Sequence, residues 1–108
     1  MSFKELKLSS EILESIEKKG YDEASPIQKK AIPLILAGHD LLAGAQTGTG
    51  KTAAFSLPIL DKMNTSKVVG EKRKIRTLII TPTRELAIQV AENIKVYGAN
   101  LNFKTETI

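Results

Sequence analysis

The spacing of apolar residues divides the chain into helical and extended segments that alternate. In the first segment Ile12, Leu13 and Ile16 share one helical face, which predicts a helix over 10–19 that Gly20 ends. Apolar residues recur at the same spacing in the segment that leads up to Gly98, at Leu86, Ala87, Val90, Ala91 and Ile94. Helices are therefore expected near both ends of the chain.

Two further helices are expected around prolines. Ser25-Pro26-Ile27-Gln28 has the order of a capping box, with serine as the N-cap, proline at the first helical position and glutamine at the third. Pro33 is expected to break this helix into two pieces. Another helix is expected from about Gly50, with Pro58 kinking or ending it, and residues 62–74 have the composition of a polar loop.

Short apolar runs between these helices have the composition of buried strands. Leu41-Leu42-Ala43 is one such run, Arg76 to Thr81 is a β-branched run bounded by Pro82, and Phe103 to Ile108 begins a third. Strands that alternate with helices predict an α/β fold with a parallel sheet, which binds ligands at the carboxyl ends of its strands. About three strands are few for this architecture, so we expect an incomplete domain.

Composition narrows the range of partners and sites. Sixteen basic against 12 acidic residues give a net charge of +4, which favours a polyanionic partner. Six of the basic residues lie between Lys62 and Arg76, where a solvated loop is the other interpretation. The absence of cysteine excludes disulfides and thiolate metal sites and fits a reducing cytoplasm. His39 is a lone histidine, and no apolar run suits a signal peptide or a membrane span, so a cytoplasmic protein without membrane contact is expected.

One segment has the residue types and spacing of a phosphate-binding loop. It consists of Ala45, Gln46, Thr47, Gly48, Thr49, Gly50, Lys51 and Thr52. The glycines can adopt φ > 0, so that backbone N–H groups turn toward an anion at the start of a helix. Lys51 then reaches the β- and γ-phosphates, and the Thr52 hydroxyl is placed to bind Mg²⁺. The pattern departs from the strict form where Ala45 replaces the first glycine, and a flexible turn between two elements is the alternative.

Four groups of residues follow one another in a diagnostic order. They are Phe3, then Gly20-Tyr21 with Pro26-Ile27-Gln28, then Ala45 to Thr52, then Pro82-Thr83-Arg84-Glu85-Leu86-Ala87. Together they resemble the start of a DEAD-box ATP-dependent RNA helicase of the bacterial RhlE-like subgroup, and the resemblance covers essentially the whole chain. It implies that residues 1–108 are the N-terminal portion of the first RecA-like domain, a partial P-loop NTPase fold that stops before the Asp-Glu-Ala-Asp motif.

In this resemblance residues 20–28 are the Q motif, which binds adenine. Gln28 would pair with the Hoogsteen edge of adenine, because an amide offers a donor and an acceptor side by side. The alternative is that Gln28 serves only as the third residue of a capping box. Tyr21 would stack on the adenine with support from Phe3, whereas the alternative makes both of them ordinary core or rim aromatics.

The other two motifs would bind phosphate groups. Residues 45–52 would be motif I, which binds ATP, with Lys51 and Thr52 as catalytic residues and Thr52 as the ligand of Mg²⁺. Residues 82–87 would be motif Ia, in which Pro82, Thr83 and Arg84 hold the sugar-phosphate of RNA without base specificity. The alternative makes Thr83 a helix N-cap and Arg84 a surface charge.

The resemblance also limits the activity expected of this chain. A protein of this family remodels or unwinds short RNA duplexes by ATP-gated closure of two RecA-like domains on RNA. The Asp-Glu-Ala-Asp and Ser-Ala-Thr motifs and the second domain are not in the sequence, so the chain alone is expected to lack ATPase and unwinding activity. Two other classes remain open, namely a different P-loop ATPase such as a kinase or a DNA translocase, and a non-enzymatic segment that binds nucleotide or a partner.

Overall fold

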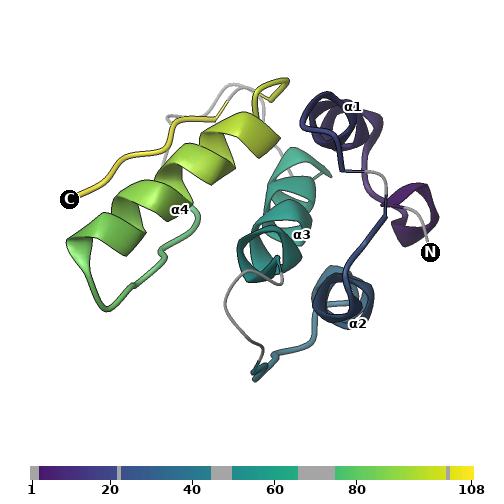
Figure 1. The fold of residues 1–108 in the computed structure, drawn as a ribbon, viewed down its shortest axis with the longest axis horizontal. Coiled ribbons are helices and arrows are strands. Elements are labelled where there is room, and N and C mark those ends of the chain that lie inside the picture. The colour runs from purple at the N-terminus through teal and green to yellow at the C-terminus, as the bar shows by residue number, and fades with distance from the viewer. Residues whose placement is uncertain (1–2, 22, 45–49, 66–74, 102) are drawn as a thin grey trace.

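Helices make up the regular structure of the described chain. The computed structural model describes residues 3–21, 23–44, 50–65, 75–101 and 103–108. Its elements are the 3₁₀-helix η1 (Phe3–Leu6) and the helices α1 (Ser10–Lys18), α2 (Pro26–Leu36), α3 (Lys51–Thr65) and α4 (Arg84–Tyr97). Figure 1 shows α3 in the middle, with α1 and α2 on one side of it and α4 on the other.

The core lies around α3, which contacts α1, α2 and α4. Leu57 on α3 is fully buried, as are Ile12 of α1 and Ile32 of α2. The buried cluster as a whole consists of Phe3, Leu6, Leu8, Ile12, Ile16, Ala24, Ile32, Ala53, Leu57, Leu60 and Tyr97. Residues that are distant in the sequence therefore form one apolar core with α3 as its shared element.

The helices predicted from apolar spacing are confirmed. The helix expected over 10–19 is α1, which ends one residue earlier, and the helix expected before Gly98 is α4. The N-cap of α4 is Thr83, whose hydroxyl accepts a hydrogen bond from the Leu86 N–H at 3.2 Å. This bond satisfies one of the amide groups that a helix start leaves without an internal partner.

A break of the helix at Pro33 and an end of the helix at Pro58 are both contradicted, whereas the kink expected as the other effect of Pro58 stays a prediction. Pro33 does not divide α2, and α3 continues past Pro58 to Thr65, so the loop expected over 62–74 starts later than its pattern suggested. Residues 66–74 lie outside the described residues. A proline removes one helical hydrogen bond, but helices in proteins are stabilised mainly by packing of their apolar face. Pro58 is itself fully buried in that packing, which offsets the lost bond.

The predicted strands and their parallel sheet do not form within the described residues. The segments 41–43, 76–81 and 103–108 have neither helical nor strand assignment. A strand is held by a hydrogen-bonded neighbour about 4.8 Å away, and the structure shows no such ladder among the residues it describes. Most apolar side chains of these segments are exposed instead, with Leu42 at 101%, Leu78 at 76% and Ile80 at 85% of full exposure, whereas Phe103 packs half-buried against the core. These segments have the residue types of strands, but the described residues do not pair into a sheet.

These exposed side chains predict self-association of the purified 108-residue chain. Replacing both Leu78 and Ile80 by threonine removes apolar surface but keeps residues that suit an extended segment. The double variant should therefore sediment with a smaller weight-average mass than the unmodified chain. The matched control is Leu34→Thr, because Leu34 is also exposed, at 41%, but lies on α2. A monodisperse monomer for the unmodified chain in sedimentation velocity would contradict the prediction.

Candidate functional site

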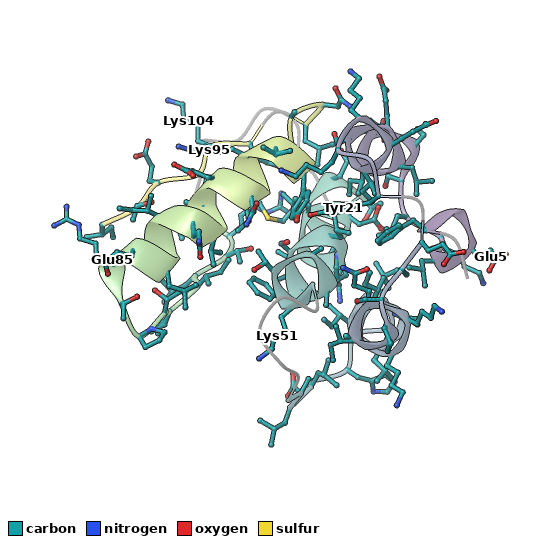
Figure 2. The ribbon with its side chains drawn as sticks, in the orientation of Figure 1. Glu5, Tyr21, Lys51, Glu85, Lys95 and Lys104 are labelled. Carbon is teal, nitrogen blue, oxygen red and sulfur yellow. The ribbon has the colours of Figure 1, made fainter. Side chains whose placement is uncertain are left out.

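The start of α3 presents a lysine and a threonine next to a glycine turn. Gly50 has φ +87°, a conformation that favours glycine, and its carbonyl accepts the first helical bond from the Ala54 N–H at 3.0 Å. Lys51 is the first residue of α3 and is exposed, and Thr52 follows it half-buried. In Figure 2 the Lys51 side chain points outward from the start of this helix. Residues 45–49, which complete the predicted phosphate loop, lie outside the described residues.

The Gln28 amide joins α2 to this turn. Its Oε1 accepts a hydrogen bond from the Ser25 N–H at 2.8 Å, and its Nε2 donates to the Gly50 carbonyl at 3.2 Å. Gln28 is only 5% exposed. The capping-box interpretation of Gln28 is confirmed for the bond that the glutamine makes. The contact with Gly50 was not predicted, and it places Gln28 directly against the glycine that precedes α3.

Little space remains between these two residues. A Cβ atom added to Gly50 would lie 2.3 Å from Gln28 Nε2 and 3.3 Å from Ser25 Oγ. Ser25 Oγ is buried there without a hydrogen-bond partner among the described residues. Gly50 is therefore fixed as glycine by its conformation and by the close approach of α2.

The aromatic residues predicted for the adenine wall do meet one another. The rings of Phe3 and Tyr21 are stacked with centroids 6.3 Å apart, and the Tyr21 hydroxyl lies 3.5 Å from that of Tyr97. Phe3 belongs to the buried core, and Tyr21 packs half-buried against it (Figure 2). Burial and the hydrogen bond with Tyr21 raise the pKa of Tyr97 above its ordinary value. The structure agrees with core and rim roles, and a contact with adenine stays a prediction.

The residues predicted to hold RNA lie at the start of α4. Pro82, Thr83 and Arg84 are all exposed, and Arg84 is the first residue of the helix. Because the Thr83 hydroxyl caps α4, the N-cap interpretation of this residue is confirmed. Figure 1 shows the start of α4 apart from the start of α3, whereas the ends of the two helices approach each other. The structure therefore does not bring this segment to the Gly50 turn.

Sequence reasoning overlooked one buried carboxylate, Asp61 on α3. It is 7% exposed and accepts hydrogen bonds from the backbone N–H and the hydroxyl of Ser9. Its position gave a signal, because Asp61 follows the core residue Leu57 by four residues and therefore falls on the same helical face. Within the described residues there is no group of three or more His, Cys, Asp or Glu that could hold a metal ion.

Comparisons with known proteins identify the family. The DEAD/DEAH box helicase family matches residues 25–108. The DEAD-box ATP-dependent RNA helicase CshA of Streptococcus pneumoniae serotype 4 (strain ATCC BAA-334 / TIGR4) is 49% identical over 108 residues, which are all of this chain and 20% of that protein. The chain belongs to the DEAD/DEAH box helicase family, and it spans about 20% of the length of this relative.

Solved structures show the corresponding fold. The RNA helicase Prp28 from Chaetomium thermophilum, bound to ADP, has a TM-score of 0.86 at 38% identity over 95% of this chain and 25% of that one. S. cerevisiae Dbp5 bound to RNA and ADP BeF3 has a TM-score of 0.79 at 38% identity over 92% of this chain and 25% of that one. The chain therefore has part of the RecA-like fold of such domains, described here through its helices. The RhlE-like subgroup is not confirmed, because the relative above carries the name CshA.

None of the helices in the described ranges is both long and apolar enough to cross a membrane.

Substituting two glycines tests the contact between Gln28 and Gly50. Gly50→Ala and Gly20→Ala both place a side chain at φ +87°, but only the first meets another residue, since the added Cβ at Gly20 has nothing within 4 Å. Strain at such a φ costs about 1–2 kcal/mol, so both variants should lose stability by a similar amount from the backbone. Gly50→Ala should lose about 1 kcal/mol more of unfolding free energy, because the added methyl group displaces the buried hydrogen bond between Gln28 and the Gly50 carbonyl.

Urea unfolding measures both losses. Adding Gln28→Ala to each glycine variant should remove the extra cost at Gly50 and leave the cost at Gly20 unchanged. Equal losses for the two single variants would contradict the close contact.

Proposed function

We propose that this chain is the ATP-binding N-terminal segment of an ATP-dependent RNA helicase that remodels or unwinds short RNA duplexes. The observation that carries the proposal is the hydrogen bond from Gln28 to the Gly50 carbonyl, which joins the Q-motif helix to the phosphate-loop helix. Family membership supports the proposal, and a kinase or a DNA translocase is disfavoured by it. The chain contributes the nucleotide site and part of the RNA contact, and it spans 20% of its relative's length.

The phosphate groups of ATP bind at the start of α3. Gly50 turns the backbone with φ +87°, and exposed Lys51 stands where a 15-residue helix leaves N–H groups without internal partners. Residues 45–52 form the cradle, and Lys51 contacts the β- and γ-phosphates as a catalytic residue. This arrangement suits an anion, because the helix dipole and the ammonium group both favour negative charge.

Thr52 supplies the protein ligand for Mg²⁺. The residue is half-buried in the first turn of α3, next to Lys51. Mg²⁺ keeps several waters and takes its remaining ligands from one or two protein oxygens and from substrate phosphates. A single hydroxyl fits that habit. The ion, when bound, neutralises charge on the β- and γ-phosphates.

Adenine binds at Gln28. An amide oxygen accepts two hydrogen bonds and an amide nitrogen donates two, and the capping box and Gly50 use one of each. By valence one acceptor site and one donor site remain, the pair that adenine N6 and N7 require, and the Gln28 amide, which is 5% exposed, turns toward the base to present them. Tyr21 stacks on the base with Phe3 behind it, in keeping with the stacked pair that these rings form.

RNA binds through the segment before α4. Pro82, Thr83 and Arg84 are exposed at a helix start, where N–H groups and a guanidinium suit a sugar-phosphate backbone. A second RecA-like domain of the complete protein completes the RNA groove and brings the groups needed for hydrolysis, so the 108 residues alone hydrolyse no ATP. The protein works in the cytoplasm.

Removing the Lys51 ammonium tests the phosphate site. A charge-assisted hydrogen bond contributes about 1.5–3 kcal/mol, so Lys51→Ala should weaken binding of Mg²⁺-ATP at least about tenfold in calorimetry. Lys30→Ala is the control, because Lys30 is an exposed lysine on α2 outside the proposed site. Unchanged affinity in the Lys51 variant would show that the phosphate loop is wrongly assigned.

Gln28→Glu tests recognition of adenine. Glutamate keeps an oxygen that accepts from the Ser25 N–H, so helix α2 should still form. Its carboxylate cannot donate a hydrogen bond at the other position, so the protein should lose its preference for ATP over GTP. We expect the ratio of GTP to ATP dissociation constants to fall by about tenfold, the worth of one hydrogen bond left unmade in a buried place. Equal binding of ATP and GTP by the unmodified protein would refute the role of Gln28.

A further inference from the structure

A second polar contact joins the N-terminal part of the chain to α3, far from the phosphate loop. Asp61 Oδ1 accepts a hydrogen bond from the Ser9 backbone N–H at 2.8 Å and another from the Ser9 hydroxyl. The carboxylate is 7% exposed, and the two residues are 52 positions apart in the sequence. This contact, called the Ser9–Asp61 clamp below, fixes the start of α1 on the side of α3.

Ser9 gives up an ordinary capping bond to make this contact. It is the N-cap of α1, yet its side chain makes no cap hydrogen bond to the helix, and its hydroxyl turns to α3 instead. Serine at an N-cap normally accepts a bond from an N–H in the first turn, which contributes about 1 kcal/mol. The carboxylate of Asp61 satisfies the N–H of the N-cap residue itself, and its negative charge suits the positive end of the α1 dipole.

The clamp and the Gln28 contact lie at opposite ends of one stretch of α3. Asp61 follows Gly50 by eleven residues, which correspond to about 16 Å along a helix. Helix α1 leads through Gly20 directly into Tyr21, whose N–H bonds to the Ile16 carbonyl at 3.1 Å, and then into α2 with Gln28. Tyr21 and Gln28, which face the base in the proposed function, therefore lie on one continuous segment. This segment is bonded to α3 through Asp61 and to the Gly50 turn through Gln28.

We propose that Asp61 is a positioning residue, which fixes the base-binding segment relative to the phosphate-binding start of α3. This inference rests on the proposed function. Apolar packing sets the general placement of α1 and α2 on α3, and the Ser9–Asp61 clamp adds a buried polar contact that fixes the start of α1 about 16 Å from the Gln28 contact. Asp61 therefore acts on the fit of adenine and not on the phosphate groups, which only α3 and the loop before it contact.

The experiment compares Mg²⁺-ATP with Mg²⁺-tripolyphosphate, a ligand that has the phosphates but no base. In the protein at its natural length, Asp61→Leu should lower the affinity for Mg²⁺-ATP by about three- to tenfold. This is the range expected when an aromatic ring no longer stacks well on the base. Its affinity for tripolyphosphate should stay within about twofold of the unmodified protein, since no contact with the phosphates changes. Asp61→Asn keeps an oxygen that accepts both bonds from Ser9, so it should restore ATP binding.

Two control variants make the result specific. Glu14→Leu, like Asp61→Leu, replaces a carboxylate by leucine, but Glu14 is exposed on α1. It should change neither the affinity for ATP nor the affinity for tripolyphosphate. Tyr21→Ala should weaken ATP but not tripolyphosphate if the base-side groups are assigned correctly. Each affinity is measured at a temperature where circular dichroism shows the variant folded.

Equal weakening of both ligands in Asp61→Leu would overturn the positioning role, because it would report a general loss of structure. Unchanged affinities in Asp61→Leu together with a selective loss in Tyr21→Ala would overturn it while the proposed function stands. If Tyr21→Ala shows no selective loss, the base-side assignment fails and the inference fails with it. If the unmodified protein binds neither ligand, the proposed nucleotide site itself is wrong.

Discussion

The fold depends on helix α3 being buried on more than one side. An ordinary surface helix buries a single apolar stripe, but α3 contacts α1, α2 and α4, so it must offer compatible surfaces in several directions. Small residues such as Ala53 allow close approach, Leu57 fills the core, and the Ser56 hydroxyl bonds to the Thr52 carbonyl within the helix. The same helix begins at Lys51, so the packing that stabilises the chain also orients the candidate phosphate site.

Local sequence rules predicted the helices well and the effects of proline poorly. Spacing and capping residues place α1 and α4 almost to the residue, because both signals act within a few positions of the chain. Pro33 was expected to break its helix and Pro58 to kink or end its helix, yet both helices continue past the proline, since contacts between helices outweigh one missing hydrogen bond. Packing between helices comes from residues far apart in the sequence, and propensity rules do not contain it.

The strand predictions failed for a related reason. A β-branched apolar run such as 76–81 states that its side chains suit a sheet, but a strand exists only when a second backbone lies at ladder distance. Within the described residues the apolar side chains of this run are solvent-exposed, with Leu78 at 76% and Ile80 at 85%. Exposed apolar side chains favour association with further structure that covers them. The sequence pattern therefore indicates a tendency to form a strand, but the described residues include no second strand that pairs with this segment.

The candidate site combines one part that sequence could predict with one that it could not. The bond between Gln28 and the Ser25 N–H follows from a three-residue spacing, so the capping box could be anticipated. The bond from Gln28 to Gly50 spans 22 positions and depends on how α2 packs against α3. Glycine permits both the left-handed turn and that approach, since a Cβ would lie 2.3 Å from the amide nitrogen. The capping role and the proposed role in adenine recognition are therefore compatible, because the first uses a single acceptor site of an amide that has four hydrogen-bonding sites.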